Sequence, residues 1–146
     1  MSDAAPIQST PQAGAIPYRL TRRGAYEVLL ITTSNGRWLI PKGGVDEGDT
    51  PEEAAVIEVY EEAGAVGVIE GDAIGSFSYI KRNTPHTVAV FPLRVQRVLS
   101  RWQEQGFRER RWLGVEGAAT LVALPEIARM IRDLPGHVRD LRANAA

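Results

Sequence analysis

The segment Gly43–Ala65, GGVDEGDTPEEAAVIEVYEEAGA, joins a glycine-rich loop to an acidic helix, and it decides the fold expected for this chain. Thr50 is a typical helix N-cap, Pro51 suits the first helical position, and Glu53 completes a capping box with Thr50. Gly64 is the residue type that commonly ends a helix. The pattern predicts one helix that begins at Thr50 and continues up to that glycine.

Three glutamates of this helix, Glu58, Glu61 and Glu62, are predicted to share one face, because they span an arc of roughly 100°. The opposite, core-facing stripe is expected to hold Val56, Val59, Tyr60 and Ala63. Like-charge neighbours destabilise a helix by roughly 0.2–0.5 kcal/mol per pair. Mg²⁺ or Mn²⁺ would remove that cost, since both prefer carboxylate oxygens. A solvated acidic face is the alternative that the spacing alone leaves open.

The loop before the helix, residues 41–48, is suited to bind an anion. Gly43 and Gly44 allow the backbone to approach a ligand closely. Backbone N–H groups near a helix N-terminus favour anions, and Lys42 adds a positive charge for phosphate. A plain turn with an exposed lysine would be preferred if the loop stood alone. Beside three glutamates, we predict a phosphate site.

The net charge of −1 conceals an uneven distribution of charge along the chain. Residues 42–64 contain eight acidic residues and one basic residue, so this segment has a net charge of −7 and the rest sums to +6. An acidic cluster within a mildly basic domain indicates a metal site next to an anionic ligand. The neutral total argues against a nucleic-acid surface, so no nucleic-acid partner is expected.

Composition narrows the class of protein further. With 146 residues, of which 44% are hydrophobic, the chain is typical of one globular domain. The absence of cysteine excludes a disulfide scaffold and a thiolate metal site, and it fits a cytoplasmic location. No apolar run approaches the roughly 18 residues that span a bilayer, so no membrane partner is expected. Residues 1–12 are predicted to be a disordered arm rather than a signal peptide, and residues 13–146 a single domain.

The remaining sequence alternates between strand-like and helix-like segments, which predicts an α/β fold around a mixed sheet. Strands are expected in six segments: 13–20, 26–33, 38–40, 76–80, 87–99 and 110–113. Helices are expected at residues 115–121 and 125–134, and Pro135 is expected to end the second of them.

The opening segment resembles the Nudix box, G-x5-E-x7-R-E-U-x-E-E-x-G-U, in which U is a bulky aliphatic residue. Gly43 matches the first glycine, and five further positions match in turn: Glu58, Val59, Glu61, Glu62 and Gly64. Asp49 stands where the pattern has glutamate, and Ile57 stands where it has arginine. Residues 38–43 and 59–64 are similar to the branch that hydrolyses diphosphoinositol polyphosphates and diadenosine polyphosphates.

This resemblance implies a Nudix-type α/β/α sandwich that hydrolyses a phosphoanhydride bond of a small molecule with the help of Mg²⁺ or Mn²⁺. Glu58, Glu61 and Glu62 would be the catalytic metal ligands, and one of them or a glutamate elsewhere would activate the water. The candidates elsewhere are Glu104, Glu109 and Glu116. The box arginine is thought to brace the carboxylates, so the changes at Ile57 and Asp49 predict weaker support of the metal site.

Substrate binding is expected to involve more of the chain than the box. Besides Lys42, Gly43 and Gly44, the candidates that lie in predicted loops and strand ends are Arg37, Arg82 and His86. For each of the last three, a solvated charge or an ordinary turn residue is the alternative.

The leading interpretation is a metal-dependent pyrophosphohydrolase that acts on a dinucleoside polyphosphate or a diphosphoinositol polyphosphate. Among enzymes, the alternative is a Nudix hydrolase of nucleotide sugars or nucleoside triphosphates. From another class, the alternative is a Nudix-like binding or regulatory domain without turnover, which Ile57 leaves open. The intact set of Glu58, Glu61 and Glu62 favours the enzyme.

Overall fold

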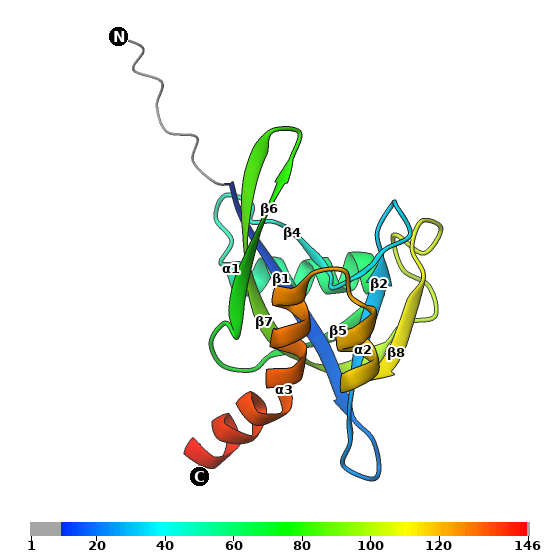
Figure 1. Cartoon of the computed structure of the whole chain (residues 1–146), viewed down its shortest axis with the longest axis vertical. Coiled ribbons are helices and arrows are strands. Elements are labelled where there is room, and N and C mark those ends of the chain that lie inside the picture. Colours follow the sequence, from blue (N-terminus) through cyan, green and yellow to red (C-terminus); the bar gives the residue numbers. More distant parts are fainter. Residues whose placement is uncertain (1–9, 146) are drawn as a thin grey trace.

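The computed structural model describes residues 10–145, which form one eight-stranded sheet with helices on both of its faces (Figure 1). The strands are β1 (Thr10–Leu20), β2 (Tyr26–Thr32), β3 (Trp38–Leu39), β4 (Lys42–Gly44), β5 (Ala65–Ile69), β6 (Gly75–Lys81), β7 (Thr84–Val98) and β8 (Arg110–Gly114). The helices are α1 (Pro51–Glu58), the π-helix η1 (Val59–Ala63), α2 (Val115–Leu121) and α3 (Pro125–Asn144).

The sheet is mixed, as predicted. β1 runs parallel to β7, from the pair Thr10 and His86 to the pair Tyr18 and Arg94. The path across the sheet is β3-β2-β1-β7-β5, and the other pairings are antiparallel. On its other edge, β1 changes partner along its length: residues 12–14 pair with β4, and residues 18–20 pair with β2. This change places β4 and the end of β2 beside each other.

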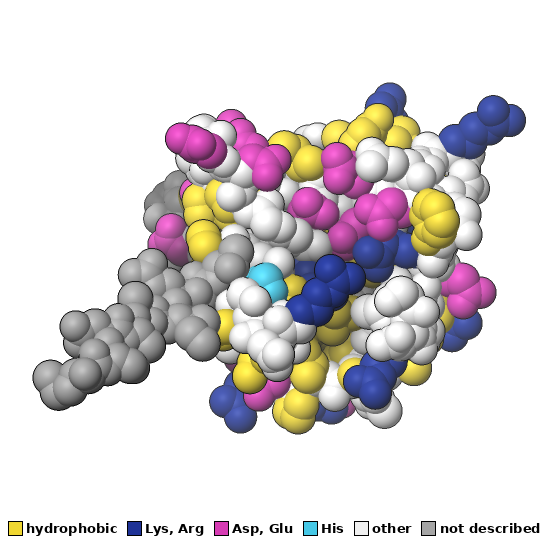
Figure 2. All heavy atoms as spheres, turned by 90° about the horizontal axis from the view of Figure 1, so that it is seen from above, with side chains coloured by type: hydrophobic (Ala, Val, Ile, Leu, Met, Phe, Trp, Pro, Cys, Tyr) yellow, Lys and Arg dark blue, Asp and Glu magenta, His cyan; other side chains and the backbone are white. Residues whose placement is uncertain are grey.

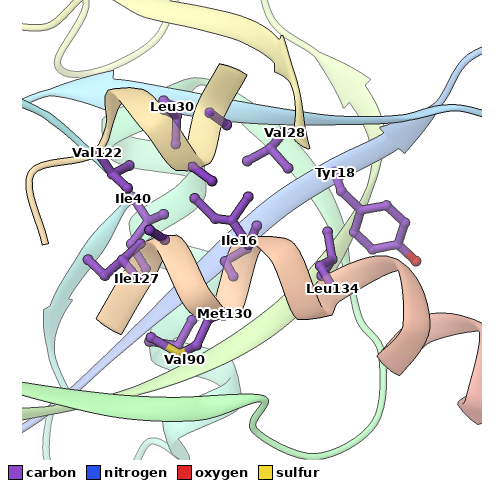
Figure 3. Packing of buried hydrophobic residues seen from close by; sticks show 14 of the residues in the cluster. Ile16, Tyr18, Val28, Leu30, Ile40, Val90, Val122, Ile127, Met130 and Leu134 are labelled. Carbon is purple, nitrogen blue, oxygen red and sulfur yellow. The ribbon is translucent and has the colours of Figure 1, made fainter. Parts of the chain in front are cut away.

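Helices cover both faces of the sheet because the central strands are apolar on both sides. In β2, Val28 and Leu30 point to one core cluster, whereas Leu29 and Ile31 point to the other. The first cluster packs against α2 and α3 (Figure 3), and the second packs against α1 and η1. The predicted α/β/α sandwich is therefore confirmed.

The strands differ from the sequence-based expectation mainly at short or glycine-containing segments. β1 begins at Thr10, so the last three residues of the expected arm belong to the sheet, while residues 1–9 lie outside the described part of the chain. β4 forms in the segment that we expected to be a loop, because its backbone pairs with β1. β5, which no local pattern indicated, pairs with β7.

The last helix continues ten residues beyond its expected end, through Pro135 to Asn144. Proline within a helix costs about 3 kcal/mol, since it removes one hydrogen bond and its ring crowds the preceding turn. The apolar stripe does not stop there, however: Leu134 and Val138 are both fully buried. Burial of this continued stripe offsets the cost of the proline.

The acidic helix also differs from the expectation, because it is α-helical only as far as Glu58 and then forms a π turn. A π turn takes more residues than an α turn, so a 3.6-residue wheel misplaces the side chains beyond Glu58. Tyr60, expected in the core, is 50% exposed, and Val56 is half-buried. Val59 and Ala63 are fully buried, as expected, and the buried face of α1 and η1 also includes Ala54, Ala55 and Glu62.

The proline within α3 gives a first testable prediction. We expect Pro135→Ala to increase the free energy of unfolding by about 1–3 kcal/mol, since alanine restores the hydrogen bond to the carbonyl of Ile131 and removes the ring. Pro125→Ala is the matched control, because a proline in the first turn costs little. Urea denaturation of both variants measures the difference. An unchanged or lower stability of the Pro135 variant would contradict this explanation of the helix.

Candidate functional site

A groove of about 790 Å³ opens where the end of β2, β4 and the β6–β7 hairpin meet the acidic helix. Figure 2 looks onto this side of the molecule, where acidic side chains gather next to lysine and arginine side chains around a hollow with hydrophobic residues. The charged residues that line the groove are Arg37, Lys42, Glu58, Glu62, Lys81 and Arg108, and polar side chains such as Gln12 and Tyr79 lie among them. The groove thus brings carboxylates and cations together, as the uneven charge distribution indicated.

Glu62 is the most buried charged residue of the site, with 6% of its surface exposed. The backbone N–H of Lys42 donates to its Oε1 at 3.1 Å, and Nη2 of Arg108 lies 3.5 Å from its Oε2. Burial raises the pKa of Glu62 to about 8, although both of these partners act in the opposite direction. The loss of hydration therefore outweighs the two donors.

Glu58 lies against the glycine that opens the box. A Cβ added at Gly43 would overlap the carboxyl group of Glu58, whereas one added at Gly44 would meet no atom within 4 Å. Burial also raises the pKa of Glu58, while a hydrogen bond that its carboxylate accepts from Glu62 lowers it. A larger residue at position 43 would therefore displace the Glu58 carboxyl group, which lies beside that of Glu62.

Glu61 is placed differently from the other two glutamates of the box. It is half-buried and does not line the groove, although its charge contributes to the raised pKa of Glu58. Among residues 10–145, no group of three His, Asp or Glu side chains stands ready to coordinate a metal. The donor set still suits a hard cation, because adjacent carboxylates that are short of hydration gain from a divalent ion. Coordination by all three requires the side chain of Glu61 to turn toward Glu58.

The C-terminal end of η1 is capped by one side chain from the segment that joins β7 to β8 and one from the first residue of β8. Gly64 ends the helix with φ 62°. Nε1 of Trp102 donates to the carbonyl of Glu62 at 3.1 Å, and Nη1 of Arg110 donates to that of Ala63 at 2.9 Å. A cation at this end opposes the helix dipole, which would otherwise disfavour the glutamates. No local pattern in the sequence indicates these caps, because they come from some 40 residues away.

On the opposite side of the groove, Lys42 is held by an aromatic side chain. Its Nζ donates to the hydroxyl of Tyr79 at 2.9 Å and lies 4.1 Å from the ring centroid. The same hydroxyl donates to Gln12 at 2.8 Å, and the ring of His86 stacks on Tyr79 at 5.0 Å. Lys42 is therefore oriented at the edge of the groove by a network that links β1, β4 and β6.

The predicted substrate-binding residues separate into two groups. Lys42, Gly43 and Arg37 line the groove together with Glu58 and Glu62. The other three do not line it: Gly44 is exposed on β4, Arg82 lies exposed in the β6–β7 turn with φ 51°, and His86 contacts the groove only through Tyr79. Their part in substrate binding therefore stays a prediction, and in this structure they lie outside the groove.

Of the three candidates for a base beyond the box, only Glu104 lies at the site. Its charge contributes to the raised pKa of both Glu58 and Glu62. Glu109 is exposed, and Glu116 forms an ion pair with Arg132 of α3 at 3.1 Å. Glu104 is therefore a fourth carboxylate at the site.

The two residues that differ from the box pattern are both at least partly exposed to solvent. Ile57 is 42% exposed and Asp49 is half-buried in the turn before α1. The weaker support expected from these two changes stays a prediction, but an arginine does reach the carboxylates, because Arg108 approaches Glu62 from the segment before β8. Local sequence could not reveal this contact, since the two residues are 46 positions apart.

The fold and the site together define an α/β/α protein with a carboxylate cluster in a polar groove. A sequence model of the NUDIX domain matches residues 10–134, and the chain therefore belongs to the Nudix family. The structure of an Ap4A hydrolase from C. elegans shares this fold, with a TM-score of 0.74 and 24% sequence identity over 89% of this chain and 98% of that chain.

Curated relatives of the chain are named as hydrolases. Nudix hydrolase 21, chloroplastic, of Arabidopsis thaliana is 40% identical over 114 residues, which cover 74% of this chain and 57% of that protein. Diphosphoinositol polyphosphate phosphohydrolase 3-alpha of Mus musculus is 38% identical over 96 residues, which cover 63% of this chain and 57% of that protein. The chain thus spans little more than half the length of these two relatives.

The contact between Gly43 and Glu58 gives a second prediction. We expect Gly43→Ala to fold but to displace the carboxyl group of Glu58, and so to weaken Mn²⁺ binding about tenfold, as displaced metal-site groups commonly do. Gly44→Ala is the matched control, because its Cβ has free space around it. Electron paramagnetic resonance of free Mn²⁺ measures the affinity of both variants. Equal affinities would show that the glycine does not position Glu58.

The burial of Glu62 gives a third prediction. Its pKa of about 8 in the folded protein exceeds the ordinary value of 4.5, so its contribution to stability is complete below pH 4.5 and is lost as the pH rises through 8. In EDTA, we expect the free energy of unfolding to fall by up to about 1.4 kcal/mol per pH unit across this range. Glu62→Gln should reduce this slope to the part that the raised pKa of Glu58 contributes, whereas Glu52→Gln, on the exposed face of α1, should retain it in full. Urea denaturation at several pH values measures it, and equal slopes in both variants would contradict the assignment.

Proposed function

We propose that this protein is a metal-dependent pyrophosphohydrolase that cleaves a phosphoanhydride bond by attack of water. The observation that carries the proposal is the placement of the neighbouring Glu58 and Glu62 carboxyl groups at the wall of a groove that Arg37, Lys42 and Lys81 also line. Carboxylates short of hydration favour a divalent cation, and cations around them favour a polyanionic ligand. The names of the relatives support the same reaction class.

Each part of the site has a distinct task in this reaction. Glu58 and Glu62, joined by Glu61, would hold Mg²⁺ or Mn²⁺, which neutralises phosphate charge and lowers the pKa of bound water. Lys42 and Arg37 bind the phosphates and orient the scissile bond. Glu104 accepts the proton of the attacking water, whose oxygen bonds to phosphorus while the P–O bond to the leaving phosphate breaks.

The substrate class follows from the number of cations in the groove. Three basic side chains from different elements, Arg37, Lys42 and Lys81, can neutralise several phosphate groups at once. Diphosphoinositol polyphosphates and dinucleoside polyphosphates carry such chains or clusters of phosphate. The name of the mouse relative supports the first class, and a C. elegans Ap4A hydrolase of known structure, 25% identical to this chain, supports the second.

A binding or regulatory domain without turnover is the second candidate. It is favoured by the exposed Ile57 at the arginine position of the box and by the absence, within residues 10–145, of a ready three-residue metal cluster. Both observations are compatible with an enzyme. Arg108 supplies an arginine to the Glu62 carboxylate, and Glu61 is near enough to Glu58 for its charge to act on that carboxyl group.

The location and partners of the protein stay predictions. No helix within residues 10–145 is long and apolar enough to cross a membrane. Some of the relatives carry chloroplastic or mitochondrial in their names, and we retain a cytoplasmic location, a small-molecule substrate and no nucleic-acid partner as our proposals for this chain.

A release assay tests the proposed function and is the fourth prediction. Purified protein is incubated with a diadenosine polyphosphate, a diphosphoinositol polyphosphate, a nucleotide sugar or a nucleoside triphosphate, in Mg²⁺, Mn²⁺ or EDTA. We expect release from one of the first two, none in EDTA, and a loss of at least about 100-fold in kcat for Glu62→Gln. Glu52→Gln, an exposed glutamate of the same helix, should stay within about twofold.

Two results of this assay would count against the proposal. Release in EDTA at the same rate in the wild type and in Glu62→Gln would contradict the mechanism. Tight binding of a ligand with no release from any substrate would favour the regulatory domain.

A further inference from the structure

Arg108 is a cation of the groove whose three guanidinium nitrogens each contact a different group. Its Nε donates to Oε1 of Glu104 at 2.7 Å, and its Nη1 donates to the carbonyl of Thr32 at 2.9 Å. Its Nη2 lies 3.5 Å from Oε2 of Glu62. The side chain of Arg108 is 22% exposed, so these contacts lie largely out of water. The guanidinium therefore joins β2, η1 and the segment before β8 at one point.

The backbone around Arg108 is held in place from two sides. Beside it, Glu109 and Thr32 exchange hydrogen bonds: the N–H of Glu109 donates to Oγ1 of Thr32 at 2.9 Å, and the N–H of Thr32 donates to the carbonyl of Glu109 at 3.0 Å. Farther along, the N–H of Glu104 donates to the carbonyl of Glu61 at 3.1 Å. These contacts attach the segment to β2 and η1 without the guanidinium. Attachment of the segment is therefore not what the guanidinium is needed for.

The orientation of two carboxylates depends on this arginine. Glu104 forms an ion pair at 2.7 Å with Arg108, and Arg108 is the cation beside buried Glu62. The box pattern has its arginine at position 57, where this chain carries an exposed isoleucine. The positive charge that the box pattern places on the helix is thus absent, and the guanidinium of Arg108, from the segment before β8, lies at the carboxylates in its place.

We infer that Arg108 is a positioning residue of the reaction: it holds the Glu62 and Glu104 carboxylates in their working orientation, in place of an arginine within the helix. This inference rests on the proposed function, since it assigns a task within that same site. The role belongs to the planar fork of the guanidinium, which can present separate nitrogens to Glu104, Thr32 and Glu62. The single nitrogen of a lysine cannot reach all three.

The decisive variant is Arg108→Lys, because it keeps the positive charge and loses the fork. We expect kcat to fall about 10–100-fold, the range found when groups that orient metal ligands are replaced. KM should stay within about threefold, since Lys42 and Arg37 still bind the phosphates, and the affinity for Mn²⁺ should fall about tenfold. Arg101→Gln, an exposed arginine of the same segment, is the matched control and should match the wild type.

Glu104→Gln separates positioning from a loss of folding. This variant removes the proposed base and weakens the strongest contact of Arg108 but leaves the bond to Thr32 in place, so it should lower kcat with little effect on the urea midpoint. In the double variant with Arg108→Lys, the combined loss in kcat should be clearly smaller than the product of the two single losses. The reason is that both substitutions remove the same contact between Arg108 and Glu104. Fully multiplicative losses would overturn the inference.

The outcomes for the inference and for the proposed function can be told apart. Wild-type kcat and Mn²⁺ affinity in Arg108→Lys would overturn the inference, and so would a lower urea midpoint as its sole effect. If neither the wild type nor Arg101→Gln releases product from any substrate, the proposed function fails. The Mn²⁺ affinities of the wild type and of Arg108→Lys, measured by electron paramagnetic resonance, then still decide whether Arg108 orients Glu62.

Discussion

The burial of the Glu62 carboxyl group is the constraint on which the rest of the site depends. A carboxylate that loses most of its hydration must find donors within the protein, and here they are the backbone of Lys42 and the guanidinium of Arg108. The first donor requires β4 to lie beside the helix, and the second requires the segment before β8 to fold over it. The raised pKa of Glu62 indicates that these donors only partly replace water, and this is one reason why we propose a divalent cation there.

The segment between β7 and β8 contacts both the proposed site and the end of the acidic helix. Trp102 of this segment and Arg110, the first residue of β8, bind the carbonyls at the end of η1, while Arg108 lines the groove and binds Glu104. The helix dipole disfavours the two glutamates near the C-terminal end of this helix, so the cations that offset their charge have to come from outside the helix. The π turn fits this arrangement, because its altered register buries Glu62 and leaves Tyr60 in solvent.

Local patterns predicted the parts of the fold whose causes are local. The capping box at Thr50 and the stop at Gly64 are present, because each depends on atoms a few residues away. β2 was predicted from its continuous apolar run, which is buried on both faces. β4, β5 and the continuation of α3 past Pro135 were not predictable, since pairing with β1 or β7, or burial of Val138, stabilises each of them.

By itself, the sequence determined that Glu58, Glu61 and Glu62 share a helix with Lys42 and Gly43 just before it, which was enough to indicate the family and the metal-site chemistry. The tertiary structure alone decided that Arg108 and Glu104 join these glutamates, whereas Arg82 and His86 do not line the groove. The physical reason is distance along the chain. Spacing within one helix sets the relative direction of its side chains, but a contact across 46 residues depends on how the strands are ordered in the sheet.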